Sequence, residues 1–301
     1  MSLEIIKAGT YTTVQDAGRL GLAHLGVPVS GFMDYQAAHL ANWMVGNQPN
    51  EAILEITWTG IELISHVNCA MAIAGAEFIC VVNDKPVNTD AVIHLKAGDH
   101  FQMQRLMVGV RAYLAVAGGL GVEPVAGSCS TLAVAQLGGL DGRQLHAGDR
   151  LNVSANGLTH GRKKPAWKKI KAQKIHVVRA IPGPEFDWLE PGEIRKAFGQ
   201  AYQLSHHSDR QGFRLKSEPI VSIKKSHLQS SGLVAGSLQV TPDGQTILAM
   251  HDAQTIGGYP RILVVNQDEL HKLAQIRPGE DIYFFVAIAQ RTVVNLSANF
   301  Q

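Results

Sequence analysis

The sequence predicts a mainly β protein, that is, a β-rich α+β fold with a few short helices. Short apolar runs recur about every eight to twelve residues between residues 61 and 116, a spacing typical of antiparallel barrels and sandwiches. The 301 residues are enough for two domains, and a composition of 46% apolar and 17% charged residues is that of a globular protein. Similar turns precede strand-like runs in both halves, which indicates two related barrels: Ala97-Gly98-Asp99, Ala147-Gly148-Asp149 and Pro278-Gly279-Glu280.

The first half is expected to begin with a strand at residues 3–7, followed by an irregular stretch with several glycines. A helix at residues 35–45 comes next, because Asp34 is placed as its N-cap and Gly46 as the residue just beyond its end. Apolar residues recur at helical spacing between these two positions. Short apolar runs then predict six strands, at residues 61–64, 70–74, 78–82, 92–95, 101–103 and 111–116.

The second half is organised around a hairpin signal. Apolar runs at residues 238–240 and 246–250 flank Pro242-Asp243-Gly244, in which proline fixes φ and glycine permits the positive φ of a tight turn. Strands are expected at residues 175–178 and within 282–289, and short helices at 193–198 and 268–276.

A basic stretch divides the chain. Seven lysines and arginines and no acid fall within residues 161–174, around a proline, which is typical of a solvated linker rather than of a nucleic-acid surface. We therefore predict an N-terminal domain at residues 1–160 and a C-terminal domain at residues 175–301.

No apolar run approaches the roughly 20 residues of a bilayer span, and the amino terminus lacks a signal-like core. We expect a cytoplasmic protein with no membrane or nucleic-acid partner.

Several chemistries lack their usual signals. The three cysteines show no CxxC spacing, which argues against a disulfide framework or a zinc knuckle: Cys69, Cys80 and Cys129. Histidines near residues 206 and 251 have no HExxH-like spacing, so no metal site is predicted. There is no GxxxxGK[ST] loop, no GxGxxG between a strand and a helix, and no GxSxG elbow. Any ATP site is therefore unconventional or belongs mainly to a partner.

Polar side chains concentrate in two loops of the second half, at residues 205–215 and 251–259. We expect these loops to meet in a cleft of the C-terminal domain, because both contain glycine and both are flanked by strands. The candidate site residues in and near this cleft are His207, Asp209, Arg210, Arg214, His251, Asp252, Gln254 and Tyr259, with Gln15 and Asp16 from the first half nearby.

Each kind of side chain implies a role. Arg210 and Arg214 suit bidentate capture of an anionic group of a substrate or nucleotide. Asp252 is the expected proton acceptor, because a carboxylate between an apolar strand and a glycine loop can be desolvated and its pKa raised, and His251 is second. Alternatives are a surface loop in which Asp209 pairs with a neighbouring arginine, and a solvated β-turn.

The residues also resemble a known family. The resemblance rests on eight motifs spread over the chain: TTVQDAGRLG (12–21), ANWMVGN (41–47), LEITWTG (54–60), RAYLAVAGGL (111–120), GSCSTL (127–132), PGPE (182–185), SDRQGFRL (208–215) and HDAQTIGGYPRI (251–262). Together they are similar to the biotin-dependent carboxyltransferase-like family, which includes the C subunits of bacterial 5-oxoprolinases, allophanate hydrolase subunit 2 and the KipI antagonist. Gln211 departs from the family, which usually has methionine there.

The resemblance implies two cyclophilin-like β-barrel domains. It also implies one component of an ATP-dependent 5-oxoprolinase, which opens the lactam 5-oxoproline to L-glutamate together with subunits A and B, the latter a KipI homologue. ATP would then act at the level of the complex. One alternative is a carboxyltransferase-type subunit of a urea carboxylase or allophanate system, to which biotin would come from another chain. Another is a noncatalytic regulator that binds a KipI-type partner.

Overall fold

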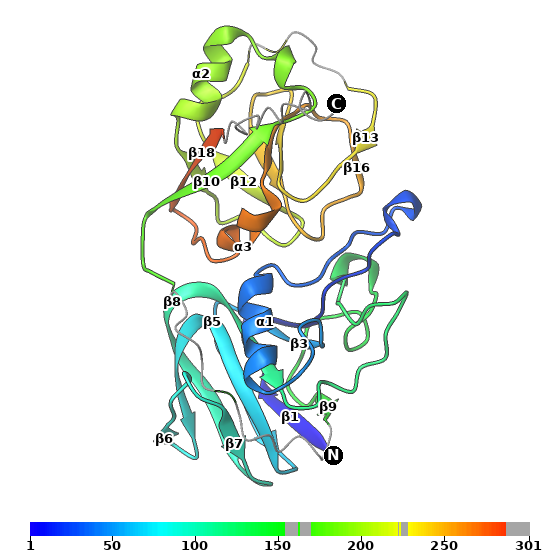
Figure 1. Ribbon diagram of the computed structural model, residues 1–301, viewed down its shortest axis with the longest axis vertical. Coiled ribbons are helices and arrows are strands. Elements are labelled where there is room, and N and C mark those ends of the chain that lie inside the picture. The colour runs from blue at the N-terminus through cyan, green and yellow to red at the C-terminus, as the bar shows by residue number, and fades with distance from the viewer. Residues whose placement is uncertain (154–161, 163–169, 222, 224–227, 287–301) are drawn as a thin grey trace, which may run out of the picture.

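The computed structural model describes residues 1–153, 162, 170–221, 223 and 228–286. Within these residues the strands form two bodies stacked along the long axis (Figure 1): a nine-stranded N-terminal sheet curled into a half-barrel, and a closed C-terminal barrel of seven strands. The prediction of a mainly β fold is confirmed. Most of the predicted linker, namely residues 161 and 163–169, lies outside the described part of the chain.

The N-terminal half-barrel has the strand order β2-β3-β8-β4-β1-β9, and β5 pairs with β8 and with the short strands β6 and β7. Its strands are β1 (Ser2–Lys7), β2 (Tyr11–Gln15), β3 (Ile53–Thr57), β4 (Glu62–Ser65), β5 (Cys69–Val82), β6 (Lys85–Pro86), β7 (Ile93–Leu95), β8 (His100–Val116) and β9 (Arg150–Asn152). Leucine, isoleucine and methionine side chains from most of these strands form its apolar core.

Two long strands replace four of the predicted short ones. The runs at 70–74 and 78–82 belong to the single strand β5, and the runs at 101–103 and 111–116 belong to β8. Gly75 and Gly109 have φ of 88° and 82°, and the register of the β5–β8 pair shifts between Gly75 and Glu77. The glycines therefore mark bulges that bend the strands without ending them.

Helix α1 (Tyr35–Met44) packs on β5 and β8. The Ala37 N–H donates to Asp34 Oδ1 at 3.0 Å, so Asp34 is the N-cap, and Gly46 follows the helix with φ of 79°. The predicted helix is confirmed at both ends. Its buried alanines share an apolar cluster with residues of β5 and β8. Asp34 lies at the junction with the C-terminal barrel, because its Oδ2 accepts Gln275 Nε2 at 2.8 Å.

The C-terminal barrel has the order β10-β17-β14-β15-β12-β11-β18 and closes through the parallel pair β10–β18. Its strands are β10 (Ile175–Pro182), β11 (Tyr202–Leu204), β12 (Gly212–Lys216), β14 (Ser237–Val240), β15 (Thr246–Ala249), β17 (Arg261–Val265) and β18 (Asp281–Val286). The predicted hairpin is the antiparallel pair β14–β15, and Gly244 in its turn has φ of 81°. Met33, from the loop before α1, is fully buried in the barrel core, so the two bodies interlock.

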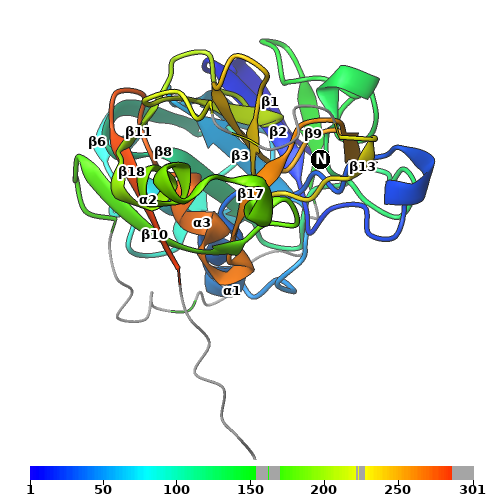
Figure 2. The ribbon, with the colours of Figure 1, turned by 90° about the horizontal axis from the view of Figure 1, so that it is seen from above.

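Short elements complete the fold. They are α2 (Pro191–Gly199), α3 (Leu270–Leu273), the two-stranded sheet of β13 (Ser231–Gly232) and β16 (Ile256–Gly257), and the 3-10 turns η1 (Ala23–Leu25), η2 (Ala133–Ala135), η3 (Phe186–Trp188) and η4 (Gln267–Glu269). The helix predicted at 268–276 is shorter than expected, because a 3-10 turn precedes α3 and the chain leaves the helix before Gln275. In Figure 2 the η1 loop extends to one side of both bodies. Every helix in the described residues falls short of the length and apolarity needed to cross a membrane.

Candidate functional site

Arg210 lies at the centre of a buried polar cluster between the two bodies and is only 5% exposed. Its Nε donates to Asp252 Oδ2 at 2.8 Å and its Nη2 to Asp252 Oδ1 at 3.0 Å, which makes a bidentate ion pair. Its Nη1 donates to Glu55 Oε1 at 2.6 Å, and its Nη2 also donates to the Gly31 carbonyl at 2.8 Å. Glu55 and Gly31 belong to the N-terminal half, so one guanidinium joins the two bodies.

The β12–β15 pairing explains why Arg210 and Asp252 meet. Beyond the ends of these strands, Met250 N donates to Gln211 O at 2.9 Å and Asp252 N donates to Arg210 O at 2.8 Å. Asp209 holds the turn that leads into β12, because its Oδ1 accepts the backbone N–H of Gln211 at 2.8 Å. The structure thus places the two polar loops of the C-terminal half side by side.

Glu55 is the acidic partner that the sequence did not reveal. It lies on β3, is 1% exposed, and its Oε2 accepts the Met33 N–H at 3.0 Å and the Tyr113 hydroxyl at 2.7 Å. Burial alone would raise the pKa of Glu55, but the Arg210 and Arg111 charges and these hydrogen bonds lower it below its usual value. A glutamate inside the otherwise apolar run of residues 53–56 was the available signal.

Arg111 completes the cluster, with its Nε 3.7 Å from Glu55 Oε1. Burial alone would lower the pKa of Arg210, but Asp252 and Glu55 together raise it well above its usual value. Two guanidiniums therefore face two carboxylates, and their charges cancel when all four groups are ionised. A buried cluster of this kind needs every partner, because removing one leaves an uncompensated charge.

His251 lies beside the cluster and carries no charge at neutral pH. Burial, followed by repulsion from Arg210, lowers the pKa of His251 to about 4. Its Nδ1 is buried and has no hydrogen-bond partner among the described residues, while its backbone carbonyl accepts the Ser30 N–H at 3.0 Å. The imidazole can accept a proton, but burial opposes the charge that would result.

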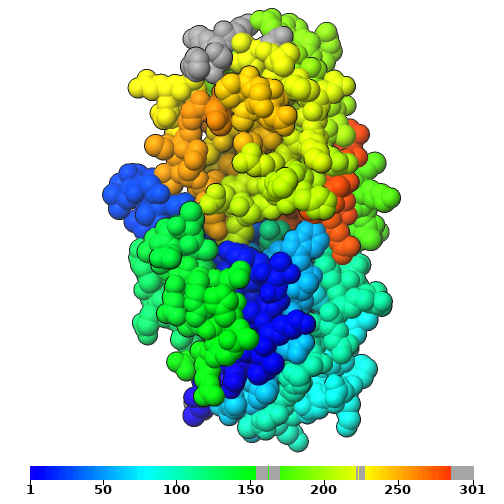
Figure 3. All heavy atoms as spheres, turned by 180° about the vertical axis from the view of Figure 1, so that it is seen from behind, coloured from blue at the N-terminus to red at the C-terminus, as the bar shows by residue number. Residues whose placement is uncertain are grey.

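A cavity of about 310 Å³ opens over the cluster. Its lining comes from both bodies: Tyr11, Thr57, Trp58, Arg111, Ala133, Val134, Ser208, Asp209, Arg210, Gln211 and Asp252. Seen from behind in Figure 3, the yellow-green part of the barrel lies over the dark blue N-terminal strands beside the green loop. The volume is at the lower end of the range for small-molecule sites. We name this cavity the rear cleft.

Gln15 and Asp16, the two residues expected near the site from the first half, differ in position. Gln15 is buried beneath the cluster, with its Oε1 3.5 Å from Nη2 of the central arginine. Asp16 turns towards the loop after residue 127, where it accepts Ser128 Oγ at 2.6 Å, Cys129 N at 2.6 Å and Ser130 Oγ at 2.5 Å. Asp16 therefore fixes a loop and does not line the rear cleft.

The geometry does not support the anion-binding role expected for the two arginines. The donors of Arg210 already serve protein acceptors, and Arg214 is exposed on β12 between the buried residues Phe213 and Leu215, so its side chain faces outward. Asp209 does line the rear cleft. The remaining expected residues are exposed and do not line it: His207, Gln254 and Tyr259.

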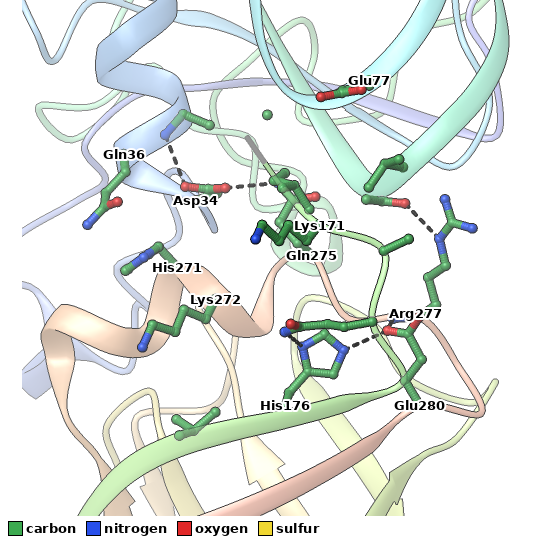
Figure 4. A pocket seen from close by; sticks show the side chains of 18 of the residues that line it. Asp34, Gln36, Glu77, Lys171, His176, His271, Lys272, Gln275, Arg277 and Glu280 are labelled. Atoms are coloured by element: carbon green, nitrogen blue, oxygen red, sulfur yellow. Dashed lines mark hydrogen bonds and ion pairs between the residues drawn. The ribbon is translucent and has the colours of Figure 1, made fainter. Parts of the chain in front are cut away.

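A second cleft, of about 700 Å³ (Figure 4), shares no lining residue with the rear cleft. At its floor Gln275 crosses from the barrel to the bulge of β8. Its Oε1 accepts the N–H groups of Val110 and Arg111 at 2.9 and 3.0 Å. Its Nε2 donates to Asp34 Oδ2 at 2.8 Å and to the Arg111 carbonyl at 2.9 Å. A Cβ at Gly109 would lie 2.9 Å from Gln275 Oε1, so glycine leaves room for this contact.

A hydrogen-bonded path joins the two clefts. The Asp34 N–H donates to the Tyr113 hydroxyl at 2.7 Å, and that hydroxyl donates to Glu55 Oε2 at 2.7 Å. Glu55 in turn holds Arg210. The polar groups that fix the domain junction and those that line the rear cleft therefore form one network.

Comparisons with known proteins agree with this architecture. The model of the family described as "Carboxyltransferase domain, subdomain A and B" matches residues 25–286. The chain is 38% identical over 288 residues to the C subunit of the 5-oxoprolinase of Escherichia coli (strain K12), and the alignment covers 94% of this chain and 90% of that protein. It is 32% identical to the urea amidolyase of Lachancea kluyveri, covering 94% of this chain and 17% of that protein.

Among solved structures, the chain resembles the Kluyveromyces lactis urea carboxylase, with a TM-score of 0.89 at 29% identity, covering 94% of this chain and 27% of that one. The family match takes in the half-barrel from residue 25 onward, the barrel, and the cluster that joins them. The chain belongs to the carboxyltransferase domain family of subdomains A and B.

Proposed function

We propose that this chain is the C subunit of a cytoplasmic, ATP-dependent 5-oxoprolinase and acts with subunits A and B to open 5-oxoproline to L-glutamate. Its similarity to the C subunit of the Escherichia coli 5-oxoprolinase extends over 94% of this chain and 90% of that protein, which supports the assignment. ATP is used by the assembled complex, because the sequence has no common nucleotide loop.

The observation that carries a chemical role is the rear cleft over a charge-balanced cluster. Asp252 lines this cleft, and Arg210 holds both of its oxygens, so the carboxylate has a fixed orientation towards a bound molecule. We assign proton transfer to Asp252, whose oxygens retain lone pairs, with His251 as the second candidate. Because its cluster carries no net charge, the cleft can take the uncharged amide group of a lactam.

The test is reconstitution. The chain alone should show little activity on 5-oxoproline, and mixing it with subunits A and B should produce ATP-dependent glutamate. Full activity from this chain alone would rule out the partner requirement.

The likeness to urea amidolyase and urea carboxylase favours one alternative, a carboxyltransferase component acting on urea. In that case, activity should require a biotin carboxylase and a biotin carrier chain, and should use urea in place of 5-oxoproline. If neither mixture turns over and the chain only binds a KipI-type protein, the regulator hypothesis holds.

A further inference from the structure

Trp58 has an unusual backbone for so large a residue, with φ of 70°. In this left-handed region a side chain crowds the backbone, and a bulky residue stays there only where its surroundings impose the conformation. The other non-glycine residues with positive φ in the described part of the chain are small or polar: Ser30, Asn83, Asp84, Ala126, Gln136 and Asp141. Trp58 is the aromatic residue of this group.

The sheet imposes the conformation. Thr57, at the end of β3, is paired on both sides, with β2 and with β8. The Trp58 N–H donates to the Val110 carbonyl at 3.0 Å. Two residues later, a Cβ at Gly60 would lie 2.0 Å from the Met103 carbonyl oxygen, so the chain passes directly against β8 there. The backbone at Trp58 is therefore fixed from both directions.

The strained conformation is not offset by packing in an apolar core. Trp58 is only partly buried and is absent from all three apolar clusters of the described residues. Trp58 instead lines the rear cleft, as do Tyr11, Arg111 and Asp252. Left-handed backbone at an open cleft wall is the pattern expected where strain places a functional side chain.

We propose that Trp58 is a specificity-determining residue of the rear cleft and gives it an aromatic wall for a planar amide, either a lactam ring or urea. The inference rests on the proposed function for its substrate class. A planar amide has a flat face that can stack on an indole, while its polar edge faces the charge-balanced cluster. Trp58 and Tyr11 supply the aromatic surface, and Asp252 supplies the polar contact.

A matched pair of variants separates binding from backbone strain. Trp58→Ala and Trp58→Gly both remove the indole, but glycine adopts a positive φ at a lower cost than alanine. In the reconstituted complex, both should raise KM for 5-oxoproline about tenfold, which is the effect of one lost aromatic contact, with kcat within about threefold. Trp58→Phe should keep KM within about threefold. Trp58→Gly should melt about 2 to 4 °C above Trp58→Ala.

A binding measurement keeps this inference separate from the proposed function. Intrinsic fluorescence of the complex is titrated with 5-oxoproline and, in a second arm, with urea. One of these should quench the signal, and the quenching should be lost in Trp58→Phe. It should be retained in Trp43→Phe, which changes a tryptophan of α1 that does not line the rear cleft. Quenching by urea alone, in a complex inactive on 5-oxoproline, overturns the proposed function and supports the role of Trp58. Two results overturn the role of Trp58. One is a KM that rises in Trp58→Ala but much less in Trp58→Gly, in step with their melting temperatures. The other is an unchanged KM in both variants together with no quenching by either amide.

Discussion

Replacing Arg210 by methionine tests whether one guanidinium holds the two bodies together. Methionine fills a similar volume without charge, so Asp252 loses both hydrogen bonds of its bidentate pair, and Glu55 loses its contact of 2.6 Å. These carboxylates are 7% and 1% exposed. Glu55 keeps the Met33 N–H, the Tyr113 hydroxyl and the more distant Arg111, whereas Asp252 is left with an uncompensated buried charge.

The expected loss follows from what breaking a buried ion pair costs. Removing one partner typically lowers the free energy of unfolding by about 3 to 5 kcal/mol. For a chain of this size each kcal/mol lowers the melting temperature by about 2 to 4 °C, so Arg210→Met should melt roughly 6 to 20 °C below the wild type. Urea denaturation followed by circular dichroism gives the free energy, and differential scanning calorimetry gives the melting temperature.

Arg214→Met is the matched control, because it removes an exposed arginine only four residues away. Its free energy of unfolding should stay within about 0.5 kcal/mol of the wild type.

Lower pH provides a second control. The pKa of Glu55 is depressed in the folded state, so its stabilising contribution is present above its unfolded pKa and is lost as the pH falls through the folded value. The wild-type advantage should therefore shrink in acid. Equal stability of Arg210→Met and Arg214→Met at neutral pH would refute this account of the junction.

Two further predictions concern the same junction. Gln275→Leu removes four buried hydrogen bonds and leaves the Val110 and Arg111 N–H groups without their acceptor, so urea denaturation should show a loss of at least about 2 kcal/mol. Gln203→Leu, which removes one exposed bond of 3.3 Å, should change stability by less than about 0.5 kcal/mol, and equal losses in the two variants would contradict the bridging role. The pKa of His251 is lowered to about 4, so the unfolded chain takes up its proton first and the wild type loses stability between pH 6.5 and pH 4. His251→Asn should abolish up to about 3 kcal/mol of that loss in the free energy of unfolding, measured by urea denaturation at pH 7 and pH 4.5. The same pH dependence in both proteins would show that the folded state does not hold His251 in its uncharged form.

Local signals predicted the elements that local chemistry determines. The ends of α1 follow from Asp34 and Gly46, and the β14–β15 hairpin follows from the turn that contains Gly244. The long strands β5 and β8 were missed, because Gly75 and Gly109 look like breaks in the sequence. In the structure they are bulges, whose backbone groups find partners far away in the chain.

The site was predictable in part. Arg210 and Asp252 both lie in loops where polar side chains concentrate in the sequence, and the barrel pairing brings those loops together. Glu55 and Gln275 were missed, since the contacts of Glu55 with Arg210 and of Gln275 with Val110 join residues more than 150 positions apart and depend on how the two bodies dock. The role expected of Arg210 also differed. Asp252 takes its bidentate edge, and Glu55 and Gly31 from the first half accept from its Nη1 and Nη2, so these donors are not open to an anion.

If the rear cleft performs chemistry in an assembled 5-oxoprolinase, its carboxylate Asp252 is needed for turnover. The most direct test is the rate of ATP-dependent glutamate formation by a complex reconstituted with Asp252→Asn. Asparagine keeps the shape of the side chain but removes its basicity and leaves part of the Arg210 charge uncompensated. The variant should therefore be less stable, and turnover per folded, assembled complex should fall about 100-fold or more. Co-elution with subunits A and B should persist. Asp84→Asn, the same change at an exposed position away from the cleft, should leave turnover unchanged. An assembled Asp252→Asn complex with wild-type turnover would contradict the claim.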